Sequence, residues 1–410
     1  MIRPFFVWLH RWTGLAMAGF LIFEGLTGSL LAFYSDLERL VSPQFYATPQ
    51  PGVVPLDFAT LAERAKVLVP QGQVTGVGLL EPDQAGISFI PRKDPATGTP
   101  YELGFVELYL DPWTGEELGR RVSFDISQGL VNLMPFIYVL HASLQLGPTG
   151  LWILGVVALL WTLDCFVGFY LTLPVVITAF WDRWRPAWQI KRRAGFFRLN
   201  FDLHRASGLW LWPMLFIFAW SSVMFNLPSV YEWMTRELLD YSTPMHGSMT
   251  MPALTHPEDQ PPKLDWRAAQ AVGERLMAEQ ISEHGFTTGR SLSFSFDPFQ
   301  GTYTYAVRSS LDVDEVRGNV AIVFDGDDGA LRHSESPTGE RSGNTVSAWL
   351  SALHLANVFG LPYRIFVCML GLVITILSVT GVYIWWMKRR ARKFSKAHRG
   401  ATPAVEIAAP

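Results

Sequence analysis

Cysteine is almost absent from this chain, and so are several motifs that mark soluble redox enzymes. Only Cys165 and Cys368 occur among 410 residues, each inside a long apolar run. A disulfide framework, a CxxC pair and a CxxCH motif for covalent haem attachment are therefore excluded, and both cysteines are interpreted as small packing residues. No GxGxxG or other nucleotide fingerprint follows a predicted strand, so this chain is not expected to bind NAD(P)H directly.

Charged residues are also scarce. They make up 17% of the chain against 49% hydrophobic residues, whereas a soluble chain of this length usually carries about a quarter charged residues. A helix of about 20 residues crosses the hydrocarbon layer of a bilayer. Four runs are long and apolar enough to do so, at Trp12–Tyr34, Leu151–Leu173, Leu209–Leu227 and Ile365–Trp386. The first is not expected to be a cleaved signal peptide, because its apolar run is too long and no small-x-small site follows it.

Basic residues cluster in three segments and predict the orientation of these spans. The segments precede the first span, fill the loop between the second and third spans, and follow the last span. Because lysine and arginine accumulate on the cytoplasmic side, all three segments are expected inside the cell. Both termini are then cytoplasmic and both long loops are exported.

The sequence indicates that the chain consists of two copies of one unit. LHRWTGL at residues 9–15 opens the first span, and LHRASGL at residues 203–209 opens the third. A Leu-His pair precedes the second and the fourth spans, and a Gly-x-Tyr motif follows each of these histidines at the same spacing. The residues are His141, Gly168 and Tyr170 in the first half, and His354, Gly381 and Tyr383 in the second. Both copies start and end inside, so they are parallel repeats.

Each exported loop is predicted to begin with an amphipathic helix and to continue with alternating strands. The helices are expected at Asp57–Val69 and Asp265–Glu283. The strands are expected at Gly72–Leu80, Gly86–Ile90 and Gly104–Leu110, and at Ser291–Phe296, Gly301–Arg308 and Gly318–Phe324. Asp111–Gly115 and Asp325–Gly329 are turns that close hairpins. The predicted fold class is a mainly α membrane protein with four transmembrane helices as two parallel repeats, each carrying a small α+β domain.

The predicted domain boundaries follow from these assignments. The first transmembrane helix takes residues 1–35, the first exported domain 36–127, and an interfacial helix plus the second transmembrane helix 128–180. The basic loop takes residues 181–198, the third transmembrane helix 199–228, and the second exported domain 229–345. An interfacial helix plus the fourth transmembrane helix takes residues 346–390, and a cytoplasmic tail takes 391–410, its last ten residues expected to be disordered.

Four of the nine histidines occupy equivalent positions in the repeat. His10 and His204 lie at the predicted cytoplasmic ends of spans one and three, and His141 and His354 lie just before spans two and four on the exported side. Each pair therefore shares one depth on two different helices, which is the arrangement that holds haem b between two neutral imidazoles. Two bis-histidine haems are predicted. The alternative is that these histidines only anchor helices at the membrane interface.

The surroundings of His10 and His204 fit a flat cofactor. Gly14 and Gly208 follow these histidines by one helical turn and would let a ring approach the backbone. Arg11 and Arg205 are the predicted partners of haem propionates, although arginine is also expected at a cytoplasmic boundary for topology alone.

Two further features have more than one interpretation. Glu24 and Asp164 fall inside spans one and two, where an ionisable group suggests proton handling or a quinol-proximal group; they could equally be protonated carboxyls in interhelical hydrogen bonds, and neighbouring spans would let them share one proton. In the second exported loop, Met245, His246, Met249 and Met251 offer soft ligands for Cu(I), or form an ordinary surface loop.

The LHRWTGL and LHRASGL segments, the Leu-His before each return span and the late Gly-x-Tyr resemble the PepSY-associated transmembrane-helix family. The resemblance covers nearly the whole chain and is weakest in the exported domains, which are similar to PepSY-type modules. The four-span layout is similar to FoxB-type inner-membrane siderophore reductases, which are haem-b proteins. This resemblance implies transfer of electrons to a ferric siderophore in the periplasm and release of Fe(II).

The expected function is therefore transmembrane electron transfer, with quinol or a partner reductase as the donor and no role for nucleic acid. Aromatic surface at Tyr109, Trp113, Tyr303 and Tyr305 is a possible platform for the siderophore, or part of a folded core. Two other functions stay open: a membrane-anchored PepSY binding or inhibitory module, and a transporter for iron, a siderophore or copper.

Overall fold

The computed structural model describes residues 2–79, 81–122, 125–191, 193, 195–243, 262–318 and 320–400, with only the backbone over 393–400. It separates into two compact units. The first, the helical unit, consists of Met1–Leu30, Leu146–Leu227 and Phe366–Pro410; the second, the sheet unit, consists of Leu31–Gln145 and Pro228–Ile365. Each unit is thus assembled from both halves of the chain.

Three helices of the described chain are long and apolar enough to cross a membrane. They are α1 (Ile2–Leu31), α5 (Gly147–Thr172) and the first 33 residues of α12 (Gly360–Gly400), Gly360–Arg392. They correspond to the predicted first, second and fourth spans. Because α1 starts at Ile2, His10 lies two turns inside this helix and not at its beginning.

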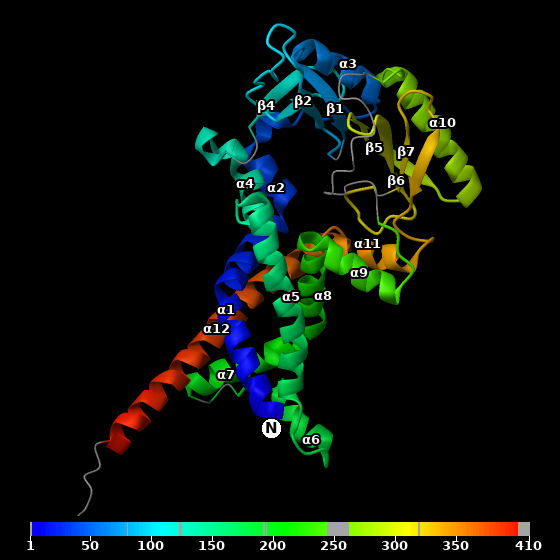
Figure 1. Cartoon of the computed structure of the whole chain (residues 1–410). Helices are drawn as coiled ribbons and strands as arrows, with labels where there is room; N and C mark the ends of the chain where they lie inside the picture. The colour runs from blue at the N-terminus through cyan, green and yellow to red at the C-terminus, as the bar shows by residue number, and fades with distance from the viewer. Residues whose placement is uncertain are drawn as a thin grey trace, which may run out of the picture. The chain divides into compact units, whose positions relative to one another are not determined.

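The predicted third span is not one straight helix. It consists of α7 (Phe196–Trp210) and α8 (Trp212–Asn226), which are bent by 70° at Leu211 (Figure 1). Pro213 lies in the first turn of α8 and explains the break, because a proline cannot donate to the carbonyl four residues earlier and its ring collides with that carbonyl. The described residues therefore contain three helices that could cross a membrane by length and composition, or up to four if the bent pair counts as one.

Small residues let α1 approach α12 closely within the helical unit. A Cβ at Gly25 or Gly371 would overlap the backbone of the other helix. The Ser29 hydroxyl lies 2.7 Å from the Gly25 carbonyl oxygen and 2.8 Å from that of Cys368, so it can donate within α1 or across to α12. Such small-residue contacts are typical of helices packed in membranes. In the same unit α5 runs beside α8.

The described residues of the sheet unit form one antiparallel sheet of eight strands, in the order β4-β3-β2-β1-β5-β6-β7-β8. The strands are β1 (Gly72–Gly78), β2 (Ala85–Pro91), β3 (Glu107–Leu110), β4 (Glu117–Arg121), β5 (Thr288–Asp297), β6 (Thr302–Ser309), β7 (Val320–Asp325) and β8 (Leu331–Glu335). The strands β1 and β5 pair in the middle, with Val77 opposite Phe294. The two α+β domains expected from the sequence therefore share a single sheet, and β4 and β8 are additional strands.

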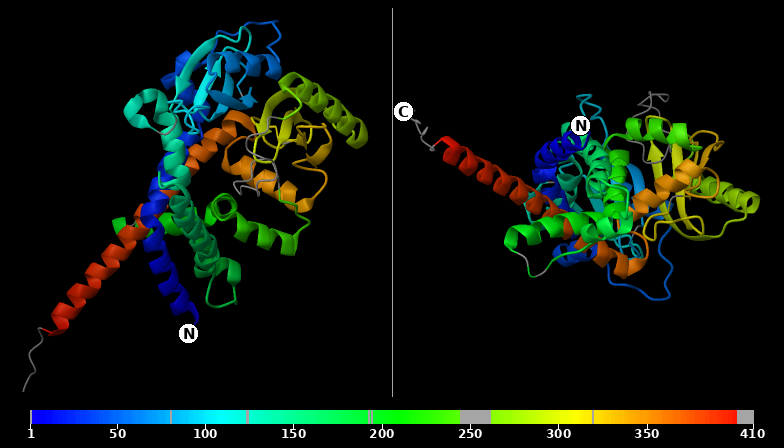
Figure 2. Two further views of the ribbon diagram at one scale, coloured as in Figure 1. Left: turned by 45° about the horizontal axis from the view of Figure 1, so that its top comes forward. Right: turned by 90° about the horizontal axis from the view of Figure 1, so that it is seen from below.

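Two helices pack on this sheet and on each other, α3 (Phe58–Leu68) and α10 (Trp266–His284) (Figures 1 and 2). Each starts at an aspartate that caps the helix: Asp57 accepts from the Thr60 amide and Asp265 from the Ala268 amide. The core between helices and sheet is rich in aromatic residues such as Phe294 and Tyr303. Both helices lie where the amphipathic pattern predicted them.

The remaining helices of the sheet unit are α2 (Tyr34–Val41), α4 (Leu133–Ser143), α9 (Pro228–Leu238) and α11 (Ser342–His354), with short helices at Pro43–Phe45, Ile126–Gln128 and Leu130–Asn132. The helical unit also contains α6 (Phe180–Trp184) and a short helix at Arg185–Trp188. Gly147 and Gly360 begin α5 and α12 with φ of +55° and +59°. Left-handed backbone of this kind favours glycine, and each glycine follows a candidate histidine by six residues.

Candidate functional site

His10 and His204 face one another in the helical unit. His10 comes from α1 and His204 from α7, and their ring centroids are 6.1 Å apart with 55° between the ring planes. The bend at Leu211 sets the direction of α7 and therefore helps to bring His204 to His10. The structure thus brings together the first pair of histidines selected from the sequence.

His141 and His354 form the second pair, in the sheet unit. They lie near the ends of α4 and α11, and their ring centroids are 6.5 Å apart with 61° between the planes. Burial, followed by the proximity of His141, lowers the pKa of His354 to about 3. His354 is therefore neutral near pH 7, and the neutral imidazole is the form that binds a metal.

The separation within each pair matches what one metal ion between two imidazoles requires. A metal–imidazole bond is about 2 Å long and the bound nitrogen lies about 1 Å from the ring centre, so two rings on opposite sides of an ion have centres about 6 Å apart. The described residues contain no group of three or more His, Cys, Asp or Glu side chains that could hold a bare metal ion. A haem needs only two protein ligands, because the macrocycle supplies the other four.

The hydrogen-bond partners of Nδ1 in His10 and His204 determine which nitrogen of each ring can bind a metal. His10 Nδ1 lies 2.9 and 3.0 Å from the two carboxyl oxygens of Asp164 on α5. His204 Nδ1 lies 3.0 Å from the Leu377 carbonyl oxygen and 3.3 Å from the Thr380 hydroxyl on α12. A carbonyl only accepts, so Nδ1 of His204 carries the hydrogen, and an ionised Asp164 requires the same of His10. Both Nε2 atoms are then unprotonated, as metal ligands must be.

Glycines on α5 and α12 leave room for the His10 and His204 rings to lie against these helices. A Cβ at Gly168 on α5 would lie 3.7 Å from His10 Cε1, and a Cβ at Gly381 on α12 would lie 3.2 Å from His204 Cε1. These are the glycines of the two Gly-x-Tyr motifs. A Cβ at Gly14, one turn after His10, would meet no atom within 4 Å, and one at Gly208 would meet only Leu377 at 3.9 Å. The residues present fit a planar group beside α1 and α7.

The cations near this pair are arranged differently from the expectation. Arg205 donates to Asp202 at 2.9 Å and to the Pro186 carbonyl at 2.6 Å. Lys388 on α12 lies close enough to Arg11 for their positive charges to interact, and its Nζ is 5.7 Å from the centre of the Phe201 ring. Neither Arg11 nor Lys388 forms an ion pair with any described residue. Sequence reasoning overlooked Lys388, because it is one of many basic residues after the last span.

The hypothesis that Glu24 and Asp164 share a proton is wrong. Asp164 is bonded to His10, and Glu24 lies 14 residues further along the same helix. At about 1.5 Å per residue this separation is about 21 Å, which no pair of carboxylate side chains can span. The two carboxyl groups are therefore too far apart to share a proton.

The aromatic platform proposed for the siderophore is mostly core. Tyr303 is 1% exposed, Tyr305 5% and Tyr109 8%, and all three have phenol hydrogen bonds inside the sheet unit. Trp113 is half-buried and donates to the Val53 carbonyl. The interpretation of these tyrosines as a binding surface is therefore wrong. The proposed copper ligands Met245, His246, Met249 and Met251 lie outside the described residues.

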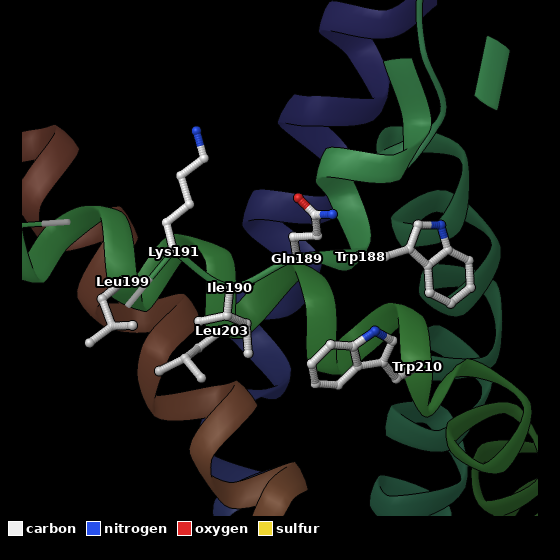
Figure 3. Close-up of a pocket in the computed structure, with 7 residues that line it drawn as sticks. All are labelled: Trp188, Gln189, Ile190, Lys191, Leu199, Leu203 and Trp210. Atoms are coloured by element: carbon white, nitrogen blue, oxygen red, sulfur yellow. The ribbon is translucent and has the colours of Figure 1, made fainter. Parts of the chain in front are cut away.

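A pocket of about 630 Å³ opens beside the helix that carries His204 (Figure 3). Leu199, Leu203 and Trp210 of α7 form one part of its lining, and Trp188, Gln189 and Lys191 form the other. Leu203 immediately precedes His204. Apolar walls with a few polar groups are typical of small-molecule sites of this size.

These long apolar helices define an integral membrane protein with one span near the N-terminus. The sequence model of the family described as PepSY-associated TM region matches residues 7–388, a range that includes all four paired histidines. The chain therefore belongs to the PepSY-associated TM family. No curated protein matches it in sequence.

Proposed function

We propose that this protein is a di-haem b electron-transfer protein of the bacterial inner membrane, which passes electrons from the cytoplasmic side or from quinol to a ferric siderophore in the periplasm and releases Fe(II). The observation that carries the proposal is the double pairing of histidines, at 6.1 Å for His10 and His204 and 6.5 Å for His141 and His354. Two unrelated surface pairs would have no reason to share this spacing.

Each histidine has a defined task in this proposal. His10 and His204 would hold one haem, and His141 and His354 the other, each through an unprotonated ring nitrogen. Haem bound by both imidazoles would supply one-electron transfer and would not readily bind oxygen or other small ligands. The residues are therefore suited to moving electrons and not to activating oxygen.

The repeat supports the same assignment. Four spans in two parallel copies would place His10 and His204 on one side of the membrane and His141 and His354 on the other, by the distribution of basic residues. Electrons would then enter on the cytoplasmic side and leave on the periplasmic side, where the sheet unit would lie. The likeness to FoxB-type siderophore reductases supports a ferric siderophore as the acceptor.

Cations near the first pair support an anionic cofactor. Arg11 and Lys388 carry positive charges that repel one another, and no described carboxylate pairs with either. Two propionates would neutralise both in charge-assisted hydrogen bonds. Arg205, bonded to Asp202 of the same helix and to the Pro186 carbonyl, would act mainly by tying α7 to the short helix at Arg185–Trp188.

The pocket beside His204 supports quinol as the electron donor. Trp188 and Trp210 offer aromatic surface for a quinol ring, and Gln189 and Lys191 are the polar residues of the same lining. Oxidation of one quinol to quinone releases two electrons and two protons. Gln189→Leu should slow reduction by a soluble quinol while leaving reduction by dithionite unchanged; equal rates with quinol in the two proteins would indicate a partner reductase instead.

The decisive experiment is spectroscopy of the purified full-length chain. Dithionite reduction should produce sharp α and Soret bands, and haem quantitation should give two haems per chain. The reduced protein should then be reoxidised by a ferric siderophore, with Fe(II) captured by a chelator. A preparation that is folded but contains no haem would overturn the proposal and favour a binding module; retained substrate flux without both histidine pairs would favour a transporter.

A further inference from the structure

The carboxylate of Asp164 contacts His10, whereas the facing His204 contacts a backbone carbonyl and a hydroxyl at the same ring atom. Its two oxygens lie 2.9 and 3.0 Å from His10 Nδ1. The position equivalent to Asp164 is Leu377, four residues before the second Gly-x-Tyr motif, and there the backbone carbonyl accepts from His204 at 3.0 Å. The two rings facing one another thus have different partners.

This difference has a chemical consequence. A carboxylate is a stronger acceptor than a carbonyl, because the hydrogen bond is charge-assisted. Withdrawing the Nδ1 hydrogen gives the imidazole more electron density at Nε2 and makes it a stronger metal ligand. A stronger donor stabilises Fe(III) more than Fe(II) and lowers the reduction potential.

The surroundings of Asp164 maintain this contact. Its side chain is 10% exposed, and an ionised carboxylate at that depth is costly without hydrogen-bond donors. His10 supplies one donor, and the Thr13 hydroxyl lies 3.2 Å from Asp164 Oδ1. Thr13 is one turn after His10 on α1, and its hydroxyl can donate either to Asp164 or to the Leu9 carbonyl, which lies 2.8 Å away.

We infer that Asp164 is a positioning residue that fixes the Nδ1–H tautomer of His10 and makes His10 the stronger of the two iron ligands, so that the haem between His10 and His204 has a lowered reduction potential. This inference rests on the proposed haem function. A lower potential at the side where electrons enter favours their onward transfer. The simpler role, a tie between α1 and α5, would hold the helices together without changing a potential.

The test is a redox titration of the intact protein that resolves the two haems. Asp164→Asn keeps an oxygen that accepts from Nδ1 but removes the charge. The reduction potential of one haem should therefore rise, by about 59 mV for each tenfold change in the one-electron equilibrium constant. The ferric EPR signal of the same haem should shift. Asp164→Leu should raise it further and weaken haem retention at that site by about 10–100-fold. The other haem should be unaffected.

Glu24→Gln is the matched control, because it also neutralises a carboxyl group of the membrane region but lies about 21 Å along α1 from His10. It should leave both potentials unchanged. Wild-type protein without haem would remove the proposed function itself. Two haems with unchanged potential and EPR signal in Asp164→Asn would leave that function intact and overturn only the role given to Asp164.

Discussion

His141 of α4 and His354 of α11 lie with their ring centroids 6.5 Å apart although they come from opposite halves of the chain. His10 and His204 repeat this relationship in the other unit, at 6.1 Å. Because both units draw on both halves, each histidine pair depends on correct assembly of the whole chain. A substitution that shifts one of the helices carrying these histidines should therefore reduce haem binding even when the chain still folds.

The two motif glycines provide a matched pair of substitutions. A Cβ at Gly381 would lie 3.2 Å from His204 Cε1, whereas a Cβ at Gly168 would lie 3.7 Å from His10 Cε1, an ordinary contact. His204 cannot easily move away, because its Nδ1 is bonded to α12 itself. Gly381→Ala should therefore weaken or shift the Soret and α bands of one haem, and Gly168→Ala should change them little. Equal effects would show that the contact with His204 is not limiting.

Arg11 and Lys388 are the two cations near the first pair that have no described carboxylate partner, and removing either of them should weaken haem retention. A hydrogen bond to a charged group contributes about 1.5–3 kcal/mol, so Arg11→Gln and Lys388→Gln should each make haem dissociate from the first site about 10–100-fold more readily. Transfer of haem to apomyoglobin measures this. Arg389→Gln is the control, because it removes one positive charge from the same helix at a residue stacked on Trp385; a loss as large as that for Lys388→Gln would indicate a general effect of charge.

The bend between α7 and α8 should be necessary for the first pair. Pro213→Ala permits the missing helical hydrogen bond and removes the collision of the ring with the Leu209 carbonyl, so α7 should turn toward the line of α8 and carry His204 away from His10. Haem content should fall from two to one. Pro362→Ala should have no such effect, because a proline in the first turn of α12 blocks no helical hydrogen bond.

The helix caps of the sheet unit provide a prediction about stability. Asp57→Ala removes the cap of α3 and should lower the free energy of unfolding by about 1 kcal/mol, measured by hydrogen exchange of the α3 amides. Glu283→Ala, at an exposed position of α10, should lower it little.

Burial raises the pKa of Asp57, but hydrogen bonds from Thr60 and Arg267 outweigh it and hold the pKa below its usual range. A depressed pKa stabilises the folded state above the unfolded value, so the contribution should be complete at pH 7 and disappear below about pH 4.

The elements with local signals were predictable from the sequence. Apolar length identified α1, α5 and α12, and amphipathic spacing after an aspartate identified α3 and α10. The turns Asp111–Gly115 and Asp325–Gly329 close the β3–β4 and β7–β8 hairpins as expected. The four histidines selected from the sequence lie in two close pairs, His10 with His204 and His141 with His354.

The features that depend on distant contacts were not predictable in the same way. Pairing of β1 with β5 joins residues such as Val77 and Phe294, which are 217 positions apart, and no local pattern distinguishes one shared sheet from two. The partner of Asp164, His10, is 154 residues away, and the position of both acids inside predicted spans suggested Glu24 instead. Pro213 was visible inside the third apolar run, but membrane helices tolerate proline, so the 70° bend could be measured only from the structure.

The central claim is that two pairs of histidines each hold one haem, and quantitation of haem in single alanine variants tests it most directly. His10→Ala and His204→Ala should lose or perturb the same haem, and His141→Ala and His354→Ala should lose or perturb the other, each leaving one intact haem per chain. If His10→Ala and His204→Ala affect different haems, or if all four variants keep the spectrum of the wild type, the pairing proposed here is wrong.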